Sequence, residues 1–273
     1  MLVNNANITE KNYKKLVLQV AHNSMSFCCI DTLNESILTF NEIPFDTTDK
    51  TITIEELYSK AYNEHNDLRA LYDEVIVLHD NNLGTFVPTP LFDEHFLGSY
   101  LQYNNKVFET DFFAFDTISS YQMNAVYIPN VTINAFLIAK YGVITYKHSY
   151  TILVSKLLAA SKNVDEKKMF VHLKEGHFEI IVVQNQKLLL FNSFEHTSPE
   201  DLIYYILFTA EQLNLNPESF KLEFLGNINE EDDNFKIAYK YIRNVSLMDT
   251  TDLLTKNSFS KADNLKHFIL FQS

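Results

Sequence analysis

The chain has 273 residues, of which 46% are hydrophobic, and its formal net charge is −13. Its 22 Phe and 15 Tyr supply more apolar surface than a disordered chain carries, so we expect a folded protein with a large core. The acidic balance argues against nucleic acid as the main ligand, because a phosphate backbone attracts clusters of Lys and Arg. No window reaches the roughly 18 apolar residues of a membrane span, so no membrane insertion is expected.

The N-terminal segment and the cysteines bear on the cellular compartment. The segment MLVNNANITEKNYKK has no basic start followed by an apolar run, as a secretory signal would have. Cys28 and Cys29 are neighbours on a predicted strand, where adjacent side chains point to opposite faces. They therefore cannot form an ordinary disulfide or share a metal, and one of them is expected in the core. These features predict a cytoplasmic protein.

Turn residues divide the start of the chain into short, mostly apolar stretches. The first three stretches predict the strands of an antiparallel meander, at residues 15–21, 25–31 and 36–42. Thr53 follows the meander, and Glu56 stands three residues later. This spacing predicts a capping box, in which the two side chains satisfy free N–H groups at the start of a helix.

The rest of the first half predicts further strands and helices. A strand is expected at 73–79, and Thr89 followed by a proline predicts a helix over residues 89–104. The segments FFAFD and NAVYIP predict two more strands. A helix is then expected to end at Gly142, because glycine adopts the left-handed conformation that stops helices. A long apolar helix near 150–161 bridges to the second half.

The second half has nearly the same plan. Its three predicted strands span residues 169–174, 177–184 and 187–195. Ser198 begins a helix, with a proline at the first helical position and Asp201 three residues after the cap. A strand is expected at 220–226, followed by a helix within 230–242 whose acidic start suits a helix N-terminus.

These similarities predict an internal duplication. The third strands align as ILTFN at 37–41 and LLLFN at 188–192, an offset of 151 residues. The helix caps Thr53 and Ser198 are offset by 145 residues. We therefore predict an α/β protein with two copies of a β-β-β-α-β-α unit, although chance similarity between two α/β halves is the alternative. The predicted lobes are residues 1–165, which include the bridging helix, and residues 166–273.

The doubled unit resembles the actin-like, or ribonuclease H-like, fold shared by sugar kinases, Hsp70 chaperones and actin. The segment FVPTPLFDEHFLGSYLQYN, at residues 86–104, resembles an uncharacterised bacterial family of unknown function whose members are described as actin-like. The resemblance implies a two-lobed architecture with mixed sheets. It also implies an ATP site in the cleft between the halves.

The resemblance also implies where the phosphates of ATP would be held. In that fold the turn between the first two strands of each half carries an Asp-x-Gly pattern followed by Ser or Thr. Glycines let backbone N–H groups approach phosphate oxygens, and the aspartate holds magnesium. In the first turn, VAHNSMS, Ala21 stands near the place of the acid and Asn23 near that of the glycine, so only Ser24 keeps a suitable type.

The second phosphate turn and the adenosine loop also lack residues that the family pattern requires. The turn LKEGHF contains Glu175 and Gly176, but in the wrong order for the pattern and in a shorter turn. The adenosine-contacting loop is usually rich in glycine, whereas FLGNINEED offers only Gly226. The chain has five glycines in total. We therefore predict a degenerate nucleotide site, for which these loop residues are the candidates.

Other chemistry has little support in the sequence. No common catalytic or nucleotide-binding motif is present, and the nine histidines have no cysteine or acid at a metal-ligand spacing. His172 and His177 flank one turn and could approach each other across the hairpin. Four acids lie beside predicted strands and could act as general bases or simply be solvated: Asp31, Asp111, Asp116 and Glu179. We predict no catalytic residue and no metal site.

The segment Leu202–Leu213 is apolar on nearly every face. A helix with this pattern is expected to be buried on all sides, here between the halves of the chain. The alternative is a surface for an unknown protein partner or for a homodimer, because tyrosines are frequent in such surfaces.

We predict a non-catalytic actin-like protein that acts as an interaction or scaffold module and needs no cofactor. The alternative is a protein that binds or hydrolyses ATP with magnesium through unusual loops. In that case Ser24, Glu175 and the loop at Gly226 would carry the contacts. A third hypothesis is an enzyme with an unrelated small ligand in the cleft.

Overall fold

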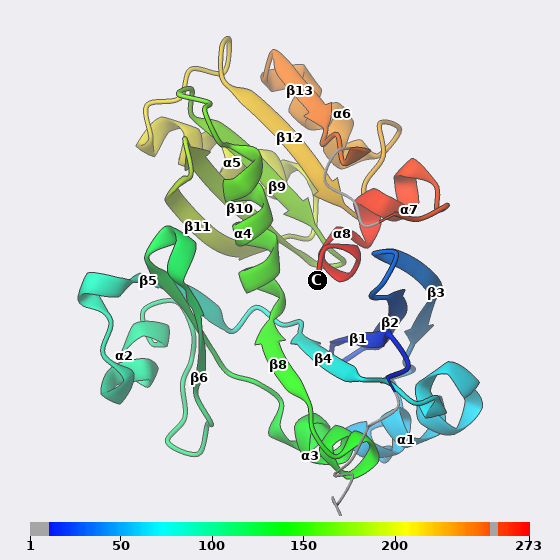
Figure 1. Ribbon diagram of the computed structural model, residues 1–273. Coiled ribbons are helices and arrows are strands. Elements are labelled where there is room, and N and C mark those ends of the chain that lie inside the picture. Colours follow the sequence, from blue (N-terminus) through cyan, green and yellow to red (C-terminus); the bar gives the residue numbers. More distant parts are fainter. Residues whose placement is uncertain (1–10, 252–255) are drawn as a thin grey trace, which may run out of the picture. The chain divides into compact units, whose positions relative to one another are not determined.

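The computed structural model describes residues 11–251 and 256–273, which form an α/β protein (Figure 1). Its strands are β1 (Lys14–Val20), β2 (Ser24–Asp31), β3 (Ser36–Pro44), β4 (Glu74–His79), β5 (Gly84–Pro88), β6 (Ala114–Ile118), β7 (Met123–Tyr127), β8 (Thr145–His148), β9 (Lys168–Leu173), β10 (His177–Gln184), β11 (Lys187–Glu195), β12 (Lys221–Gly226) and β13 (Asn244–Leu247). Its α-helices are α1 (Ile54–Glu64), α2 (Leu97–Leu101), α3 (Val131–Tyr141), α4 (Ser149–Ala160), α5 (Pro199–Gln212), α6 (Asp233–Tyr241), α7 (Lys261–Lys266) and α8 (Phe268–Phe271). Within these residues, no helix has the length and apolar character needed to cross a membrane.

The strands form three sheets within the described part of the chain. Two sheets have five strands each, in the orders β3-β2-β1-β4-β8 and β11-β10-β9-β12-β13, and the third has the order β5-β7-β6. The chain divides into two compact units. The first consists of Met1–Leu78 and Asn130–Tyr146, and the second of His79–Pro129 and Lys147–Ser273. These units group residues by packing, whereas the predicted boundary at residue 165 separates repeats, so the lobe boundary stays a prediction.

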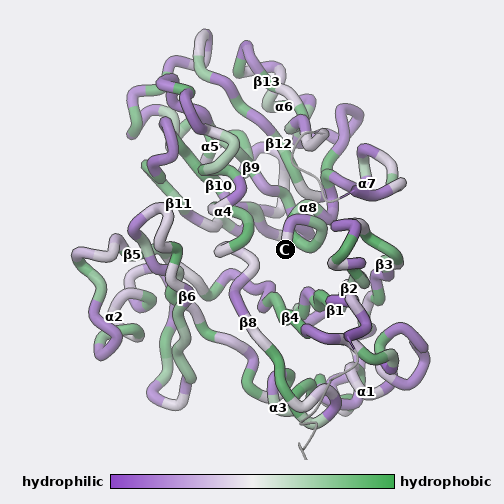
Figure 2. The backbone as a smooth tube through the Cα atoms, in the orientation of Figure 1, coloured by the Kyte–Doolittle hydropathy of each residue, from purple (hydrophilic) through white to green (hydrophobic). Residues whose placement is uncertain are grey.

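The core of the first unit lies between its sheet and two helices. Alternate residues of β1, such as Leu16 and Leu18, point to one face of the sheet and are fully buried. Tyr58 of α1 and Phe136 of α3 pack into the same core. Most residues of α3 are hydrophobic (Figure 2). This helix ends as predicted at Gly142, which has a φ of +78°.

The second unit contains the second meander, whose sheet is mixed. Strand β10 pairs antiparallel with β9 and with β11, while β12 pairs parallel with β9 and with β13. The middle strand of each meander carries one register shift, between Cys29 and Ile30 in β2 and between Val182 and Val183 in β10. The predicted strands of both meanders are confirmed to within two residues at each end. Descent of the two halves from a duplication stays a prediction.

The predicted capping boxes are both present. Thr53 accepts a hydrogen bond from the Glu56 amide, and the Glu56 side chain accepts one from the Thr53 amide. Ser198 and Asp201 exchange the same pair of bonds at the start of α5. At α6, the acidic run also acts as predicted, because Asp232 caps the helix.

Two helix predictions were wrong. The expected helix over 89–104 is instead two 3-10 turns and the five-residue α2, because Asp93 accepts a bond from the His95 amide and begins a separate turn. Helix α5 is not buried on all sides, since Tyr204 is 62% exposed and Phe208 is 47% exposed. Their rings stack on each other, with centroids 6.2 Å apart, on the outer side of the helix.

Some elements carry no clear sequence signal. The short strands β5, β8 and β13 were not predicted, and each has only four or five residues. Cys28 and Cys29 are both buried, whereas only one was expected in the core. Tertiary packing, and not the local sequence pattern, determines where these strands form and which side chains are buried.

We expect Ser198→Ala to lower the free energy of unfolding by about 1 kcal/mol, because the amide of Asp201 at the start of α5 loses its acceptor. Urea denaturation followed by circular dichroism measures the change. The matched control is Ser258→Ala, since Ser258 is exposed and has no hydrogen bond from its hydroxyl among the described residues. Equal stabilities of the two variants would contradict the capping role.

Candidate functional site

The turn between β9 and β10 stands where the second phosphate clamp was expected. The amide of Lys174 donates to the carbonyl of His177 at 3.0 Å, which closes a minimal turn with Glu175 and Gly176 at its tip. Gly176 has a φ of +77°, a conformation that glycine adopts without strain. Both tip residues are exposed, and the Gly176 carbonyl accepts a bond from the amide of His196. The turn is therefore a tight hairpin that carries no aspartate.

The side chain of Lys174 is paired inside the second unit. Its ammonium group forms an ion pair with Asp80, the residue that directly follows β4. The two side chains are only 15% and 12% exposed. Burial alone would lower the pKa of Lys174, but the carboxylates of Asp80 and Glu179 raise it above its usual value. The lysine is therefore charged, and its charge is already balanced by the protein.

Glu179 of β10 is a fully buried carboxylate beneath this turn. It accepts hydrogen bonds from Nδ1 of His172 at 2.7 Å and from the hydroxyl of Tyr150 at 3.0 Å. Nε2 of His177 lies 3.3 Å from Oε1, the oxygen that also accepts from Tyr150. Burial alone would raise the pKa of Glu179, but Lys174 and these donors hold it well below its usual value. The two histidines thus meet at Glu179.

The N-terminus of α4 holds two further carboxylates. The Ser149 hydroxyl donates to Asp80 at 2.8 Å, and the Thr151 hydroxyl donates to Asp116 at 2.6 Å. The amide of His148 also donates to Asp116, at 2.9 Å. A helix N-terminus attracts anions through its free N–H groups and its dipole. Here the chain's own side chains fill that position.

His148 is the N-cap of α4 and is buried. Its Nδ1 accepts a hydrogen bond from the amide of Tyr150 at 3.1 Å, and its Nε2 lies 3.2 Å from the side-chain oxygen of Asn81. Burial lowers the pKa of His148 from 6.5 to about 3. The neutral ring fits these contacts, because it has one acceptor nitrogen for the amide and one N–H for Asn81.

Gly226 does not form an open adenosine loop. It ends β12 with a φ of +93°, and a Cβ at this position would lie 2.2 Å from the carbonyl oxygen of Leu173 and 2.9 Å from its nitrogen. The next amide, of Asn227, donates to the same carbonyl at 2.8 Å. The glycine therefore allows β12 to approach the end of β9 closely. Its role in the structure is backbone packing.

The first predicted clamp lies in the other unit and is also an ordinary hairpin. The amide of Ala21 donates to the carbonyl of Ser24 at 3.0 Å, and the carbonyl of Asn23 accepts from the amide of Phe45 at 2.8 Å. The Tyr58 hydroxyl donates to the carbonyl of Ala21 at 2.9 Å. The turn sequence contributes no carboxylate, so only the uncharged side chains of Asn23 and Ser24 remain as candidates there.

The other candidate bases, Asp31, Asp111 and Asp116, accept hydrogen bonds from nearby groups of the chain. Asp31 accepts bonds from the amides of Leu33 and Asn34 in a turn, and Asp111 accepts one from the amide of Phe108. Burial raises the pKa of Asp116, although three donors, including the Tyr127 hydroxyl, point at its carboxylate. In the described part of the chain, no three His, Cys, Asp or Glu side chains gather as a metal site would require.

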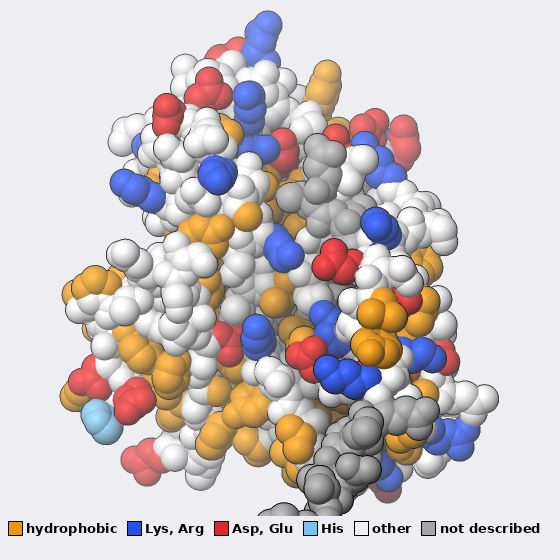
Figure 3. Space-filling view, in the orientation of Figure 1, with side chains coloured by type: hydrophobic (Ala, Val, Ile, Leu, Met, Phe, Trp, Pro, Cys, Tyr) orange, Lys and Arg blue, Asp and Glu red, His pale blue; other side chains and the backbone are white. Residues whose placement is uncertain are grey.

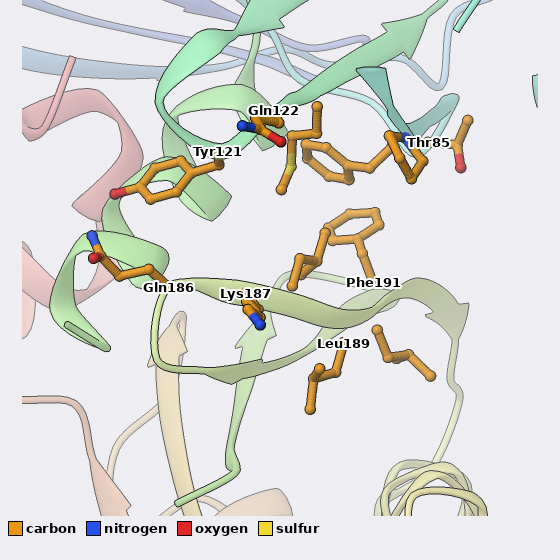
Figure 4. Close-up of a pocket in the computed structure, with 12 residues that line it drawn as sticks. Thr85, Tyr121, Gln122, Gln186, Lys187, Leu189 and Phe191 are labelled. Carbon is orange, nitrogen blue, oxygen red and sulfur yellow. The ribbon is translucent and has the colours of Figure 1, made fainter. Parts of the chain in front are cut away.

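A separate cavity of about 450 Å³ lies in the second unit, beside β11. Figure 4 shows Lys187 and Phe191 of this strand on one side, and Tyr121 and Gln122 on the other. Phe191 is in ring contact with Phe86 of β5, with centroids 4.9 Å apart. The lining is apolar and amide-rich, and Lys187 is its only charged residue. It offers no pair of groups suited to acid–base catalysis.

The central residues of the buried cluster, Asp80, Tyr150 and Lys174, were not among the predicted site residues. One signal was available, because the apolar strand 74–79 is followed directly by the polar run of Asp80 and two asparagines. A polar group at the end of a buried strand is a common position for functional or buried ionic side chains. The pairing with Lys174 spans 94 residues and has no local signature.

The sequence and the fold have recognisable relatives. A family model described as protein of unknown function (DUF3822) matches residues 3–245. Among solved structures, a Bacteroides thetaiotaomicron protein with an actin-like ATPase fold and unknown function is 21% identical, with a TM-score of 0.79 over 87% of this chain and 91% of that one. No curated protein matches the sequence.

Two solved structures from bacterial assembly systems are also similar to this chain. The PilM–PilN type IV pilus biogenesis complex matches at 12% identity, with a TM-score of 0.62 over 94% of this chain and 96% of that one. The cytoplasmic domain of EpsL, an inner-membrane component of the type II secretion system of Vibrio cholerae, matches at 13% identity, with a TM-score of 0.48 over 95% of each chain. The predicted actin-like fold is therefore confirmed.

We expect Gly226→Ala to lower the free energy of unfolding by more than about 2 kcal/mol, because the added Cβ would meet the backbone of Leu173. The matched control is Gly176→Ala, where φ is also positive but a Cβ meets nothing within 4 Å. Denaturant titration of both variants measures the difference. Equal losses would show that backbone strain, and not close packing, accounts for Gly226.

We expect stability to fall as the pH drops below 6.5, because the unfolded chain then protonates His148 while the folded chain, with a pKa of about 3, does not. His148→Asn keeps a capping side chain and removes the titration, so its free energy of unfolding should change less between about pH 6.5 and pH 5. Urea titrations across this range measure the slope. Equal slopes in His148→Asn and the unsubstituted protein would refute the assignment.

Proposed function

The chain belongs to the family described as protein of unknown function (DUF3822), and we propose that it is a non-catalytic interaction or scaffold module. In this proposal the actin-like fold is retained and the nucleotide-binding loops are degenerate. The proposal includes no cofactor. It places the protein in the cytoplasm, in keeping with the sequence prediction.

One observation carries the proposal: the ammonium group of Lys174, at the second phosphate turn, is paired with Asp80. A phosphate arriving at this turn would have to displace that carboxylate. It would also approach the buried negative charge of Glu179, which the same lysine helps to balance. Removing one partner from a buried ion pair leaves an uncompensated charge, which is strongly unfavourable.

The N-terminus of α4 supports the same conclusion. The His148 amide and the hydroxyls of Ser149 and Thr151 would suit an anion, but they already donate to Asp80 and Asp116. A magnesium ion would need carboxylate oxygens that are available to it. In the described residues of this region, the carboxylates of Asp80, Asp116 and Glu179 are all engaged by donors of the chain.

The proposed interaction role is supported by one similar structure and by exposed aromatic side chains of this chain. One structure of similar fold and extent belongs to the PilM–PilN type IV pilus biogenesis complex, which is an assembly of proteins. In this chain, Tyr204 and Phe208 form an exposed aromatic pair on α5. We propose this pair as one contact surface for a protein partner or a second copy, because exposed aromatic groups are frequent at interfaces.

The alternative is an actin-like protein that binds ATP through Glu175 and Gly176, whose exposure leaves the turn accessible. In that case Lys174 would exchange Asp80 for a phosphate. Ser24 and Gly226 would be its further contacts, although the packing of Gly226 against Leu173 disfavours a ligand there.

We expect magnesium-ATP to leave the thermal unfolding temperature unchanged, because the charge on Lys174 is already paired. A ligand that binds only the folded state stabilises it by about 2.7 kcal/mol at a hundredfold excess over its dissociation constant, so binding would be visible. The measurement is a thermal-shift titration together with a phosphate-release assay. Lys174→Met serves as the matched variant.

Stabilisation by magnesium-ATP that is lost in Lys174→Met, or release of phosphate above the rate of a buffer blank, would overturn the proposal in favour of the ATP-binding alternative. Magnesium-AMP provides the control for effects of ionic strength and of the adenosine group. No stabilisation by either nucleotide supports the non-catalytic proposal.

A further inference from the structure

The segment around α2 exposes an unusual concentration of large apolar side chains. Single exposed apolar residues are normal on a protein surface, whereas a contiguous group marks an interaction site. Six of them fall between residues 91 and 115, with exposed fractions between 37% and 84%. They are Leu91, Phe96, Tyr103, Phe108, Phe112 and Phe115.

Three of these rings surround one open depression of about 650 Å³, which we name the α2 surface. Its exposed aromatic members are Phe96, Phe108 and Phe112. Phe113 packs against Gly98 of α2, where a Cβ would lie 3.1 Å from the phenylalanine ring. In Figure 3, hydrophobic and acidic side chains and a histidine lie together on the part of the surface that α2 occupies in Figure 1.

The backbone beneath these rings is held by internal hydrogen bonds. The hydroxyl of Tyr100 donates to the carbonyl of Leu91 and accepts from the amide of Asp93. On the other side, the carboxylate of Asp111 accepts from the amide of Phe108 at 2.8 Å. The exposed rings are therefore presented by a fixed scaffold, which lowers the entropy lost when a partner binds.

The charge around the depression indicates the chemistry of the partner. Glu94, Glu109 and Asp111 line it, and no Lys or Arg is among its lining residues. Glu94 and Glu109 are exposed and form no ion pair within the described residues. The ring of Phe108 already accepts a cation, since Nζ of Lys106 lies 5.0 Å from its centroid. Aromatic faces and carboxylates together favour Lys or Arg.

We propose that the α2 surface docks a segment of another protein that combines apolar side chains with Lys or Arg. The proposal deepens the interaction role proposed above and rests on it. The apolar side chains would fill the depression over Gly98, and the cations would contact the acids and the exposed rings.

Charge also disfavours two other occupants. In a symmetric dimer the same surface would face itself, which would bring Glu94 and Glu109 of two copies together. An anionic membrane would be repelled by the same acids, because like charges raise the free energy of association. A basic and apolar protein segment has neither conflict.

The test uses two short labelled peptides of equal length, one of alternating leucine and arginine and one of alternating leucine and glutamate. Fluorescence anisotropy with the full chain measures their affinities without nucleotide. We expect the arginine peptide to bind at least about tenfold more tightly, and its affinity to fall as salt is raised. The double variant Glu94→Lys/Glu109→Lys should reverse this preference.

The matched control is Glu211→Lys/Glu230→Lys, which changes the net charge equally at exposed positions outside the α2 surface. It should keep the preference for the arginine peptide. Phe96→Ser/Phe112→Ser should weaken that peptide about tenfold, whereas Tyr239→Ser, at another exposed aromatic, should not. Circular dichroism of each variant verifies folding, and the charge variant tests the proposal even if the phenylalanine variant unfolds.

Any of these results would overturn the proposal: no binding of the arginine peptide, equal binding of both peptides, an unchanged preference after charge reversal, or binding to vesicles that contain phosphatidylserine. Light scattering that shows a dimer dissolved by Glu94→Lys/Glu109→Lys would also refute it in favour of a second copy. None of these results involves nucleotide. The docking proposal can therefore be refuted while the magnesium-ATP titration still supports the non-catalytic proposal. Equally, the non-catalytic proposal can be refuted while the peptide measurements support docking.

Discussion

The buried carboxylate of Glu179 is the constraint around which the second unit is organised. A charge taken out of water is tolerated only where partners surround it. Here the partners come from three directions: His172 on the neighbouring strand β9, Tyr150 on α4 and Lys174 at the turn. Lys174 in turn requires Asp80 at the end of β4. One ionised side chain thereby ties together two strands, a helix and a turn.

In our proposal, this arrangement lets the actin-like fold keep its shape without a nucleotide. The ammonium group of Lys174 is paired with Asp80, and the hydroxyls of Ser149 and Thr151 at the start of α4 donate to Asp80 and Asp116. The chain's own carboxylates satisfy the same electrostatic demand that an anion would. In the proposal, contact with a protein partner therefore uses other surfaces of the chain.

Much of the fold could be predicted from local pattern. Mostly apolar stretches separated by tight turns located both meanders, and Thr53 with Glu56 and Ser198 with Asp201 located α1 and α5. The prediction failed where local signals conflicted. Thr89 and its proline looked like a helix start, but the capping by Asp93 broke the segment into short turns. The apolar α5 was predicted to be fully buried, but its residues Tyr204 and Phe208 are exposed and stack on each other.

The sequence alone determined most strands and helices and the absence of the phosphate-binding pattern. Turns, helix caps and the Asp-x-Gly pattern each depend on a few residues that are close together in the sequence. It could not determine the candidate site. In the sequence, Glu179 was one of several candidate acids. Only the tertiary structure showed its hydrogen bond with Tyr150, 29 positions earlier, and the pairing of Lys174 with Asp80, 94 positions earlier. Gly226 looked like a remnant of a ligand loop, and its contact with Leu173 made it a packing residue. Electrostatic compensation and close backbone contact are long-range properties, so only the folded chain decides them.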